Sequence, residues 1–208
     1  MAVDLESDTG TESRSDGAAY LERLVGGPGV SLLAMALVSL AMWTGAQAGN
    51  ITPFVLTPPF DEAWWQLPLS VFAHSGMAHL TSNATIIVVA GGLVAITAGI
   101  VRYHLFFVTT GIAAGVAQVA ATDALGEAGG VLGASGAALA LVAYVLMSND
   151  ISSWVLRHVP RWVVGVAIVG VAVALTLRSA GTQIANVAHL VGALLGAVAG
   201  HVNLLRTE

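Results

Sequence analysis

The sequence contains no cysteine and no lysine, and only 9% of its residues are charged. Without cysteine, the chain can form neither a disulfide framework nor a thiolate metal site, and a cysteine nucleophile is excluded. Soluble domains carry about a quarter charged residues. A chain that is 56% hydrophobic therefore lacks the polar groups to cover a water-facing surface. Lipid-facing helices need no such cover, because their backbone groups are bonded internally. The composition predicts an all-α, polytopic membrane protein.

The first 28 residues differ from the rest of the chain because they are polar and acidic. Five of the six carboxylates in this segment lie among serine, glycine and threonine residues and are Asp4, Glu6, Asp8, Glu12 and Asp16. We expect residues 1–28 to form a disordered, solvated cytoplasmic tail rather than an acidic interaction segment, since they cannot bury enough apolar surface to fold. A cleavable signal peptide is not predicted, because its basic first region is missing. Acidic residues without lysine also fit a salt-rich cytoplasm, as in a halophile.

Apolar stretches of membrane-spanning length recur along the remaining residues. A helix needs about 20 apolar residues to cross the hydrocarbon core. On this basis we predict one transmembrane domain over residues 29–205, with six spans at about 30–48, 78–101, 104–121, 133–147, 162–177 and 183–204. The first loop contains several prolines and the pair Trp64 and Trp65. This composition suits a segment at the membrane–water interface, not one that crosses the bilayer.

The arginines are distributed unevenly between the predicted loops. With the N-terminus inside, six of the seven arginines lie on the cytoplasmic side, and only Arg178 lies outside. Arginine and lysine are enriched in the cytoplasmic loops of membrane proteins. We therefore predict a multi-pass protein of the cell membrane with both its N-terminus and its C-terminus in the cytoplasm.

A few polar residues fall within or beside the predicted spans, where each one requires a reason. His74, His79 and Asn83 lie at the entry to the second span, and His79 and Asn83 share a helix face because they are four residues apart. Ser135 begins the fourth span, and His189 lies in the last. Taken singly, a serine in a membrane helix usually bonds its own backbone, and a histidine more often bonds a neighbouring helix than acts as a catalyst.

Glycines spaced by four residues form a stripe on the last predicted span and are Gly192, Gly196 and Gly200. Such a stripe lets a neighbouring helix backbone come close. If that neighbour carries Ser135, its hydroxyl comes within reach of His189. A histidine that takes the proton of a serine hydroxyl produces an activated nucleophile. Acyl transfer also requires donors for the oxyanion, and His79, Asn83 and the backbone N–H of Ser135 are candidates.

These residues form three motifs that resemble those of the rhomboid family of intramembrane serine proteases. The family's H-x4-H-x3-N pattern corresponds to His74, His79 and Asn83. Its G-x-S-G pattern corresponds to Gly133, Ser135 and Gly136. Its A-H-x-x-G-x-x-x-G pattern corresponds to Ala188, His189, Gly192 and Gly196. The motifs come in the family's order on the expected spans, and the resemblance covers roughly residues 30–204.

The resemblance implies a six-helix bundle with a membrane-embedded first loop that hydrolyses peptide bonds of single-span membrane proteins. It implies a catalytic pair of Ser135 and His189 without an aspartate, and oxyanion stabilisation by His79, Asn83 and the Ser135 N–H. The residues expected to support this site are His74, Gly133 and Gly136. The expected partners are transmembrane substrates and the lipid bilayer. We expect no cofactor, no metal and no nucleic acid.

Three positions depart from the family's pattern. The Trp-Arg pair of the first loop reads Trp65-Gln66, a glutamate of the second span falls at Ala95, and a tyrosine one turn after the serine is Leu139. The first two changes concern the scaffold and loop anchoring, and the third concerns the orientation of the His189 ring. The alternative function is therefore a proteolytically weak or silent relative that binds membrane clients. A small transporter is a third class, but the predicted spans contain no acidic residue and no internal repeat is evident.

Overall fold

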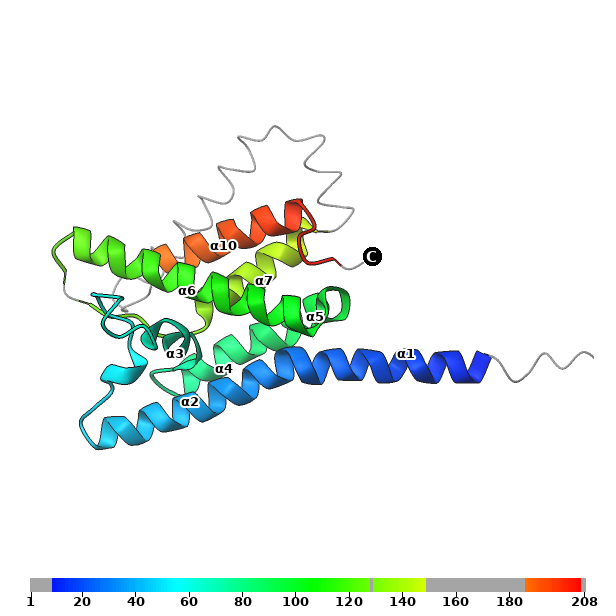
Figure 1. The fold of residues 1–208 in the computed structure, drawn as a ribbon, viewed down its shortest axis with the longest axis horizontal. Helices are drawn as coiled ribbons and strands as arrows, with labels where there is room; N and C mark the ends of the chain where they lie inside the picture. Colours follow the sequence, from blue (N-terminus) through cyan, green and yellow to red (C-terminus); the bar gives the residue numbers. More distant parts are fainter. Residues whose placement is uncertain (1–8, 128, 149–185, 207–208) are drawn as a thin grey trace, which may run out of the picture.

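The computed structural model describes residues 9–127, 129–148 and 186–206 (Figure 1). Within these ranges the chain is helical, and the only strand-like pairing is an isolated bridge between Leu56 and Val131. Three helical stretches are long and apolar enough to cross a membrane, namely Gly17–Gln47, Met77–Ala98 and Ile100–Ala124. Two shorter apolar helices accompany them. The protein is therefore an all-α, multi-pass membrane protein.

The first long helical stretch consists of α1 (Thr9–Leu24), a π-helical turn η1 (Val25–Gly29) and α2 (Val30–Gln47). Pro28 lies inside η1, where the wider turn accommodates a residue that has no N–H to donate. The Nε2 atom of His104, a residue of another helix, lies 2.7 Å from the carbonyl oxygen of Gly26 in η1 and is hydrogen-bonded to it.

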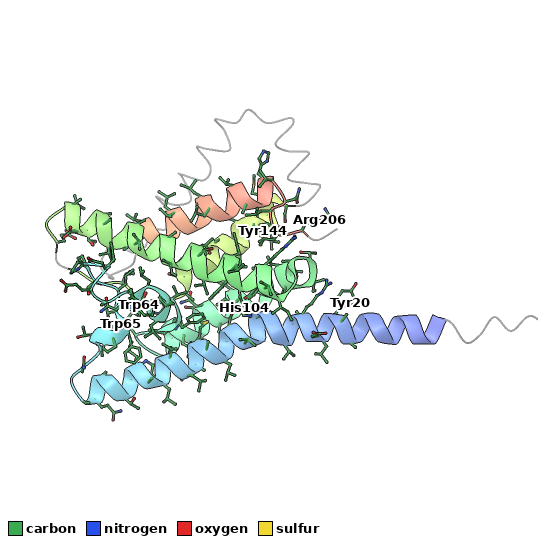
Figure 2. All side chains as sticks on the ribbon, in the orientation of Figure 1. Tyr20, Trp64, Trp65, His104, Tyr144 and Arg206 are labelled. Atoms are coloured by element: carbon green, nitrogen blue, oxygen red, sulfur yellow. The ribbon has the colours of Figure 1, made fainter. Side chains whose placement is uncertain are left out.

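This helix differs from the disordered tail predicted over residues 1–28, since the chain is helical from Thr9 onward. In Figure 1, α1 extends beyond the other helices at the end of the bundle where Tyr20 lies in Figure 2. Alanine, leucine, glutamate and arginine are frequent after residue 17, and all favour helix. Helix propagation from an already formed span also avoids the cost of a new nucleus. The polar composition therefore did not prevent a continuous helix.

The first loop carries η2 (Thr52–Phe54) and α3 (Gln66–Phe72) and is held together by the buried side chain of Gln66. The Oε1 atom of Gln66 accepts hydrogen bonds from the backbone N–H of Thr57 at 3.1 Å and from its hydroxyl at 3.3 Å. The Nε2 atom donates to the carbonyl of Thr52 at 2.9 Å. Gln66 occupies the position where the family pattern has arginine, and its hydrogen bonds hold this loop in place.

Trp64 and Trp65 lie on the outside of this loop, at the end of the bundle opposite Tyr20 (Figure 2). Their side chains are 65% and 42% exposed, and the two rings meet edge to face. Paired, exposed tryptophans are typical of a surface at the headgroup level of a bilayer.

The next two spans form a tight hairpin. The first arm is α4 (Met77–Ile86), a π-helical turn η3 (Ile87–Gly91) and α5 (Gly92–Ala98), and the second is α6 (Ile100–Ala124). A single residue, Gly99, separates the arms, with a φ of 74° that glycine adopts at little cost. The predicted boundary near residues 101–104 therefore lies a few residues too late.

Ala95, where the family pattern has a glutamate, lies at a close contact between the first helix and α5. Ala95 is fully buried, and a Cβ atom on Gly27 would lie 3.1 Å from the Ala95 methyl group. A glutamate side chain at position 95 would require the first helix to move away. Alanine therefore serves here as a packing residue between two helices.

The last pair of helices, α7 (Ser135–Met147) and α10 (Asn186–His201), touch through their backbones. A Cβ atom on Gly192 or Gly196 would overlap the carbonyl of Gly136 or Ala140, and one on Gly200 would lie 2.6 Å from the carbonyl oxygen of Tyr144. Helix α6 packs against both (Figure 1). The glycine stripe thus lies against the helix that begins with Ser135. The predicted fifth span, 162–177, lies outside the described residues, and so does the beginning of the predicted span 183–204.

Candidate active site

The turn before α7 brings Ser135 to the first position of a helix. Gly133 has a φ of 120°, a conformation that side chains other than glycine rarely adopt. A Cβ atom on Gly133 would also lie 2.6 Å from the Cε1 atom of His79. The N–H of Gly133 donates to the carbonyl of Ser70 in α3 at 2.8 Å. The turn therefore needs glycine both for its backbone conformation and for the close approach of the His79 ring.

The structure brings Ser135 and His189 together. The Oγ atom of Ser135 lies 2.9 Å from the Nε2 atom of His189, and both residues are partly buried. This distance is that of a normal hydrogen bond. In the tautomer whose Nε2 carries no proton, the hydroxyl donates to the ring, which is the arrangement required for proton transfer from serine to histidine.

Gly136 lies where α6, α7 and α10 meet. A Cβ atom at this position would lie 2.5 Å from the Cβ atom of Ala114 in α6 and 3.5 Å from the carbonyl oxygen of Ala188 in α10. Ala188 immediately precedes His189. The absence of a side chain at Gly136 therefore allows the two neighbouring helices to approach next to the serine and the histidine.

His74 is fully buried and connects three parts of the chain. Its Nε2 atom accepts a hydrogen bond from the backbone N–H of Ala134 at 3.4 Å. Its Nδ1 atom lies 3.0 Å from the carbonyl oxygen of Phe72 and 3.1 Å from the Oγ atom of Ser39 in α2. Because Nε2 accepts, the ring proton lies on Nδ1. His74 therefore holds the residue that precedes Ser135 against the first loop and the first helix.

The charge state of His74 agrees with this structural role. Burial, assisted by the nearby ring of His79, lowers the pKa of His74 to about 4, although its hydrogen bond to Phe72 acts in the opposite direction. The ring is therefore neutral near pH 7 and can accept a hydrogen bond from the Ala134 N–H.

His79 and Asn83 lie on α4, which packs against α7. The Nδ1 atom of His79 is 3.3 Å from the Oγ atom of Ser75. When Ser75 donates this bond, the ring proton lies on Nε2, the nitrogen next to Gly133. Asn83 is 3% exposed, and its Nδ2 atom has no hydrogen-bond partner among the described residues. A buried amide donor without a partner costs free energy, so an acceptor placed beside this Nδ2 atom would be bound favourably.

Sequence reasoning missed Gln118, Ser39 and Ser75 as contributors to this site. The Oε1 atom of Gln118 in α6 accepts hydrogen bonds from the N–H groups of Val187 at 2.9 Å and Ala188 at 3.2 Å. Gln118 and Ser39 are polar residues inside predicted spans. A polar residue inside a span requires a reason, and this signal could have indicated both residues. Within the described residues, no group of three or more histidine or acidic side chains could hold a metal ion.

These elements define a multi-pass helical membrane protein with a serine and a histidine hydrogen-bonded between two of its helices. The family model of the Rhomboid domain matches residues 61–206, which include every residue of the candidate site except Ser39. The chain belongs to the rhomboid family, whose members are usually intramembrane serine proteases. A comparison with curated proteins found no match.

Proposed function

We propose that this protein is an intramembrane serine endopeptidase that hydrolyses peptide bonds of single-span membrane proteins. The observation that carries this proposal is the distance of 2.9 Å between Ser135 Oγ and His189 Nε2. His189 takes the hydroxyl proton as Ser135 Oγ attacks the substrate carbonyl carbon. The protonated ring then gives this proton to the leaving amine, and a water molecule activated by the same ring hydrolyses the acyl-enzyme.

Three donors are available for the oxyanion that forms in this reaction. Ser135 is the first residue of α7, so the helix leaves its backbone N–H without an intrahelical partner. The buried Nδ2 atom of Asn83 has no partner among the described residues, and the His79 ring lies against Gly133. Donors that are fixed in place before the reaction stabilise developing charge without reorganisation. This supports oxyanion stabilisation by His79, Asn83 and the Ser135 N–H.

The reaction consumes water, so the site must open to an aqueous side of the membrane. The arginine distribution favours cytoplasmic termini, which puts the Ser135 end of α7 at the outer side of the cell membrane. The exposed pair Trp64 and Trp65 lies on the first loop, which also supplies the contact from Ser70 to Gly133. We infer that this loop lies at the outer headgroup level and that substrates reach the serine from the lipid.

The test is cleavage of a model single-span substrate in proteoliposomes. Ser135→Ala and His189→Ala should each abolish cleavage, because removing either member of the pair removes its function. Two exposed residues provide matched controls, Ser82→Ala on α4 and His201→Ala at the end of α10, and both should cleave at the wild-type rate. Cleavage by Ser135→Ala would exclude Ser135 as the nucleophile.

A weak or silent relative that binds membrane clients remains the second candidate, because Leu139 stands where the family pattern has a tyrosine. Leu139 lies one turn after Ser135 in α7 and offers no hydrogen-bonding group to orient an imidazole. This candidate predicts that wild-type protein captures single-span clients by photocrosslinking without cleaving them. Turnover of substrate by wild-type protein would exclude it.

A further inference from the structure

The beginning of α10 is held by a side chain from another helix. The first turn of any helix has backbone N–H groups without intrahelical partners. In α10, two of these groups, from Val187 and Ala188, donate to the same acceptor, the Oε1 atom of Gln118. Gln118 lies in α6, about 70 residues earlier in the chain. This contact therefore joins α6 to the beginning of α10, next to His189.

The position of the contact matters because Ala188 and His189 are consecutive. The carbonyl oxygen of Ala188 lies beside Gly136, and Gly136 follows Ser135. A shift of α10 relative to α6 would therefore move the His189 ring relative to the Ser135 hydroxyl. The 2.9 Å distance between them depends on this alignment.

The glycine stripe does not fix the alignment along the helix axis by itself. Gly192, Gly196 and Gly200 repeat every four residues, and the residues they face, Gly136, Ala140 and Tyr144, repeat at the same spacing. Because Gly192, Gly196 and Gly200 carry no side chains, this face of α10 offers few ridges that could interdigitate with grooves on α7, and so little that opposes sliding. The stripe sets the distance between the helices, whereas the hydrogen bonds from Gln118 are directional and act on the axial position of α10.

We propose that Gln118 is a positioning residue, whose two hydrogen bonds to the beginning of α10 fix the axial position of His189 against Ser135. This inference rests on the proposed proteolytic function. Gln118 itself contributes no group to the reaction. A displacement of about 1 Å in a catalytic group can reduce the rate on the order of 10²-fold. A lost cap should therefore lower kcat by about 10-fold to 10²-fold and leave KM nearly unchanged, since substrate docking does not involve this contact.

The experiment compares Gln118→Met, which keeps the length of the side chain but removes the acceptor, with Gln118→Glu, which keeps an acceptor oxygen. Cleavage kinetics of a model substrate and detergent melting curves are measured for both. Gln47→Met, at the exposed end of α2, is the matched control. We expect Gln118→Met to lose kcat at unchanged KM, and Gln118→Glu to restore most of it. A residue with a purely structural role would lower the melting temperature and leave the kcat of the folded protein unchanged. That result, or a normal Gln118→Met enzyme, would overturn the proposal.

A second measurement applies if Gln118→Met does not fold. Amide hydrogen exchange of the wild-type protein should show Val187 and Ala188 protected, and Gln118→Asn, whose shorter side chain cannot reach them, should expose both and lower kcat. Exposed amides at these two positions in the wild-type protein would contradict the proposal. If wild-type protein cleaves nothing, the proposed function fails, whereas the exchange measurement still decides whether Gln118 holds α10.

Discussion

Gly196→Ala adds a single methyl group where α7 and α10 touch through their backbones. The new Cβ atom would overlap the carbonyl group of Ala140, and backbone atoms cannot rotate away as a flexible side chain can. To reach an ordinary contact distance of at least 3.4 Å, the helices must separate locally by about 1 Å. Overpacking of this kind typically costs about 1–3 kcal/mol. In lipid, close packing supplies much of helix association, so this cost is not offset elsewhere.

The same displacement affects the candidate active site, because His189 lies two turns before Gly196 on α10. A shift of about 1 Å can reduce the rate on the order of 10²-fold, which corresponds to about 2.7 kcal/mol of transition-state free energy. We therefore expect Gly196→Ala to lower both the melting temperature and the cleavage rate, although it changes no reacting group. Gly17→Ala is the matched control, since a Cβ atom there would meet nothing within 4 Å. If Gly196→Ala melts and cleaves like the wild type, the backbone contact does not position His189 and the reasoning is wrong.

Three further predictions concern the polar residues around the site. Asn83→Ala should reduce the cleavage rate by roughly 10²–10³-fold, the usual effect of removing one oxyanion donor, at an unchanged melting temperature. A wild-type cleavage rate in this variant would show that Asn83 has a purely structural role. Gln66→Leu removes both the acceptor for Thr57 and the donor to Thr52. Because the backbone groups of both threonines then lack partners, the first loop should be destabilised by about 1–3 kcal/mol, which is measured as faster proteolysis of this loop. The pKa of His74 is lowered from 6.5 to about 4, so the unfolded chain binds more protons between these values, and the melting temperature should fall as the pH drops from about 6.5 toward 4. A His74→Gln variant with the same pH dependence would show that another group is responsible.

The motifs predicted the residues of the site better than the ends of the helices. The spacing of His79 and Asn83, and the glycines around Ser135 and on the last span, are local patterns whose geometry follows from the helix repeat. The proximity of Ser135 to His189 followed from them only with the assumption that the glycine stripe faces α7. The structure has this arrangement, with Gly196 against Ala140. Chemical roles, in contrast, remain predictions until activity is measured.

Contacts between distant segments could not be predicted from local patterns. The cap that Gln118 provides for α10 joins residues about 70 positions apart, and the ties from Gln66 to Thr52 and Thr57 depend on the path of the loop. Likewise, no propensity rule indicates the π-helical turns η1 and η3, because these depend on how neighbouring helices pack. The acidic, serine-rich composition of the first residues does not indicate helix α1, because this helix extends from the apolar span that follows it.

The most direct test of the central claim is to map the adduct formed by a fluorophosphonate that reacts with activated serines. Purified wild-type protein in detergent or nanodiscs is incubated with the reagent, digested and analysed by mass spectrometry. We expect one modified residue, Ser135, no adduct in Ser135→Ala, and strongly slowed modification in His189→Ala, whose fold is checked by its melting curve. Unmodified Ser135 in folded wild-type protein, or equally fast modification in His189→Ala, would contradict the claim that His189 activates Ser135.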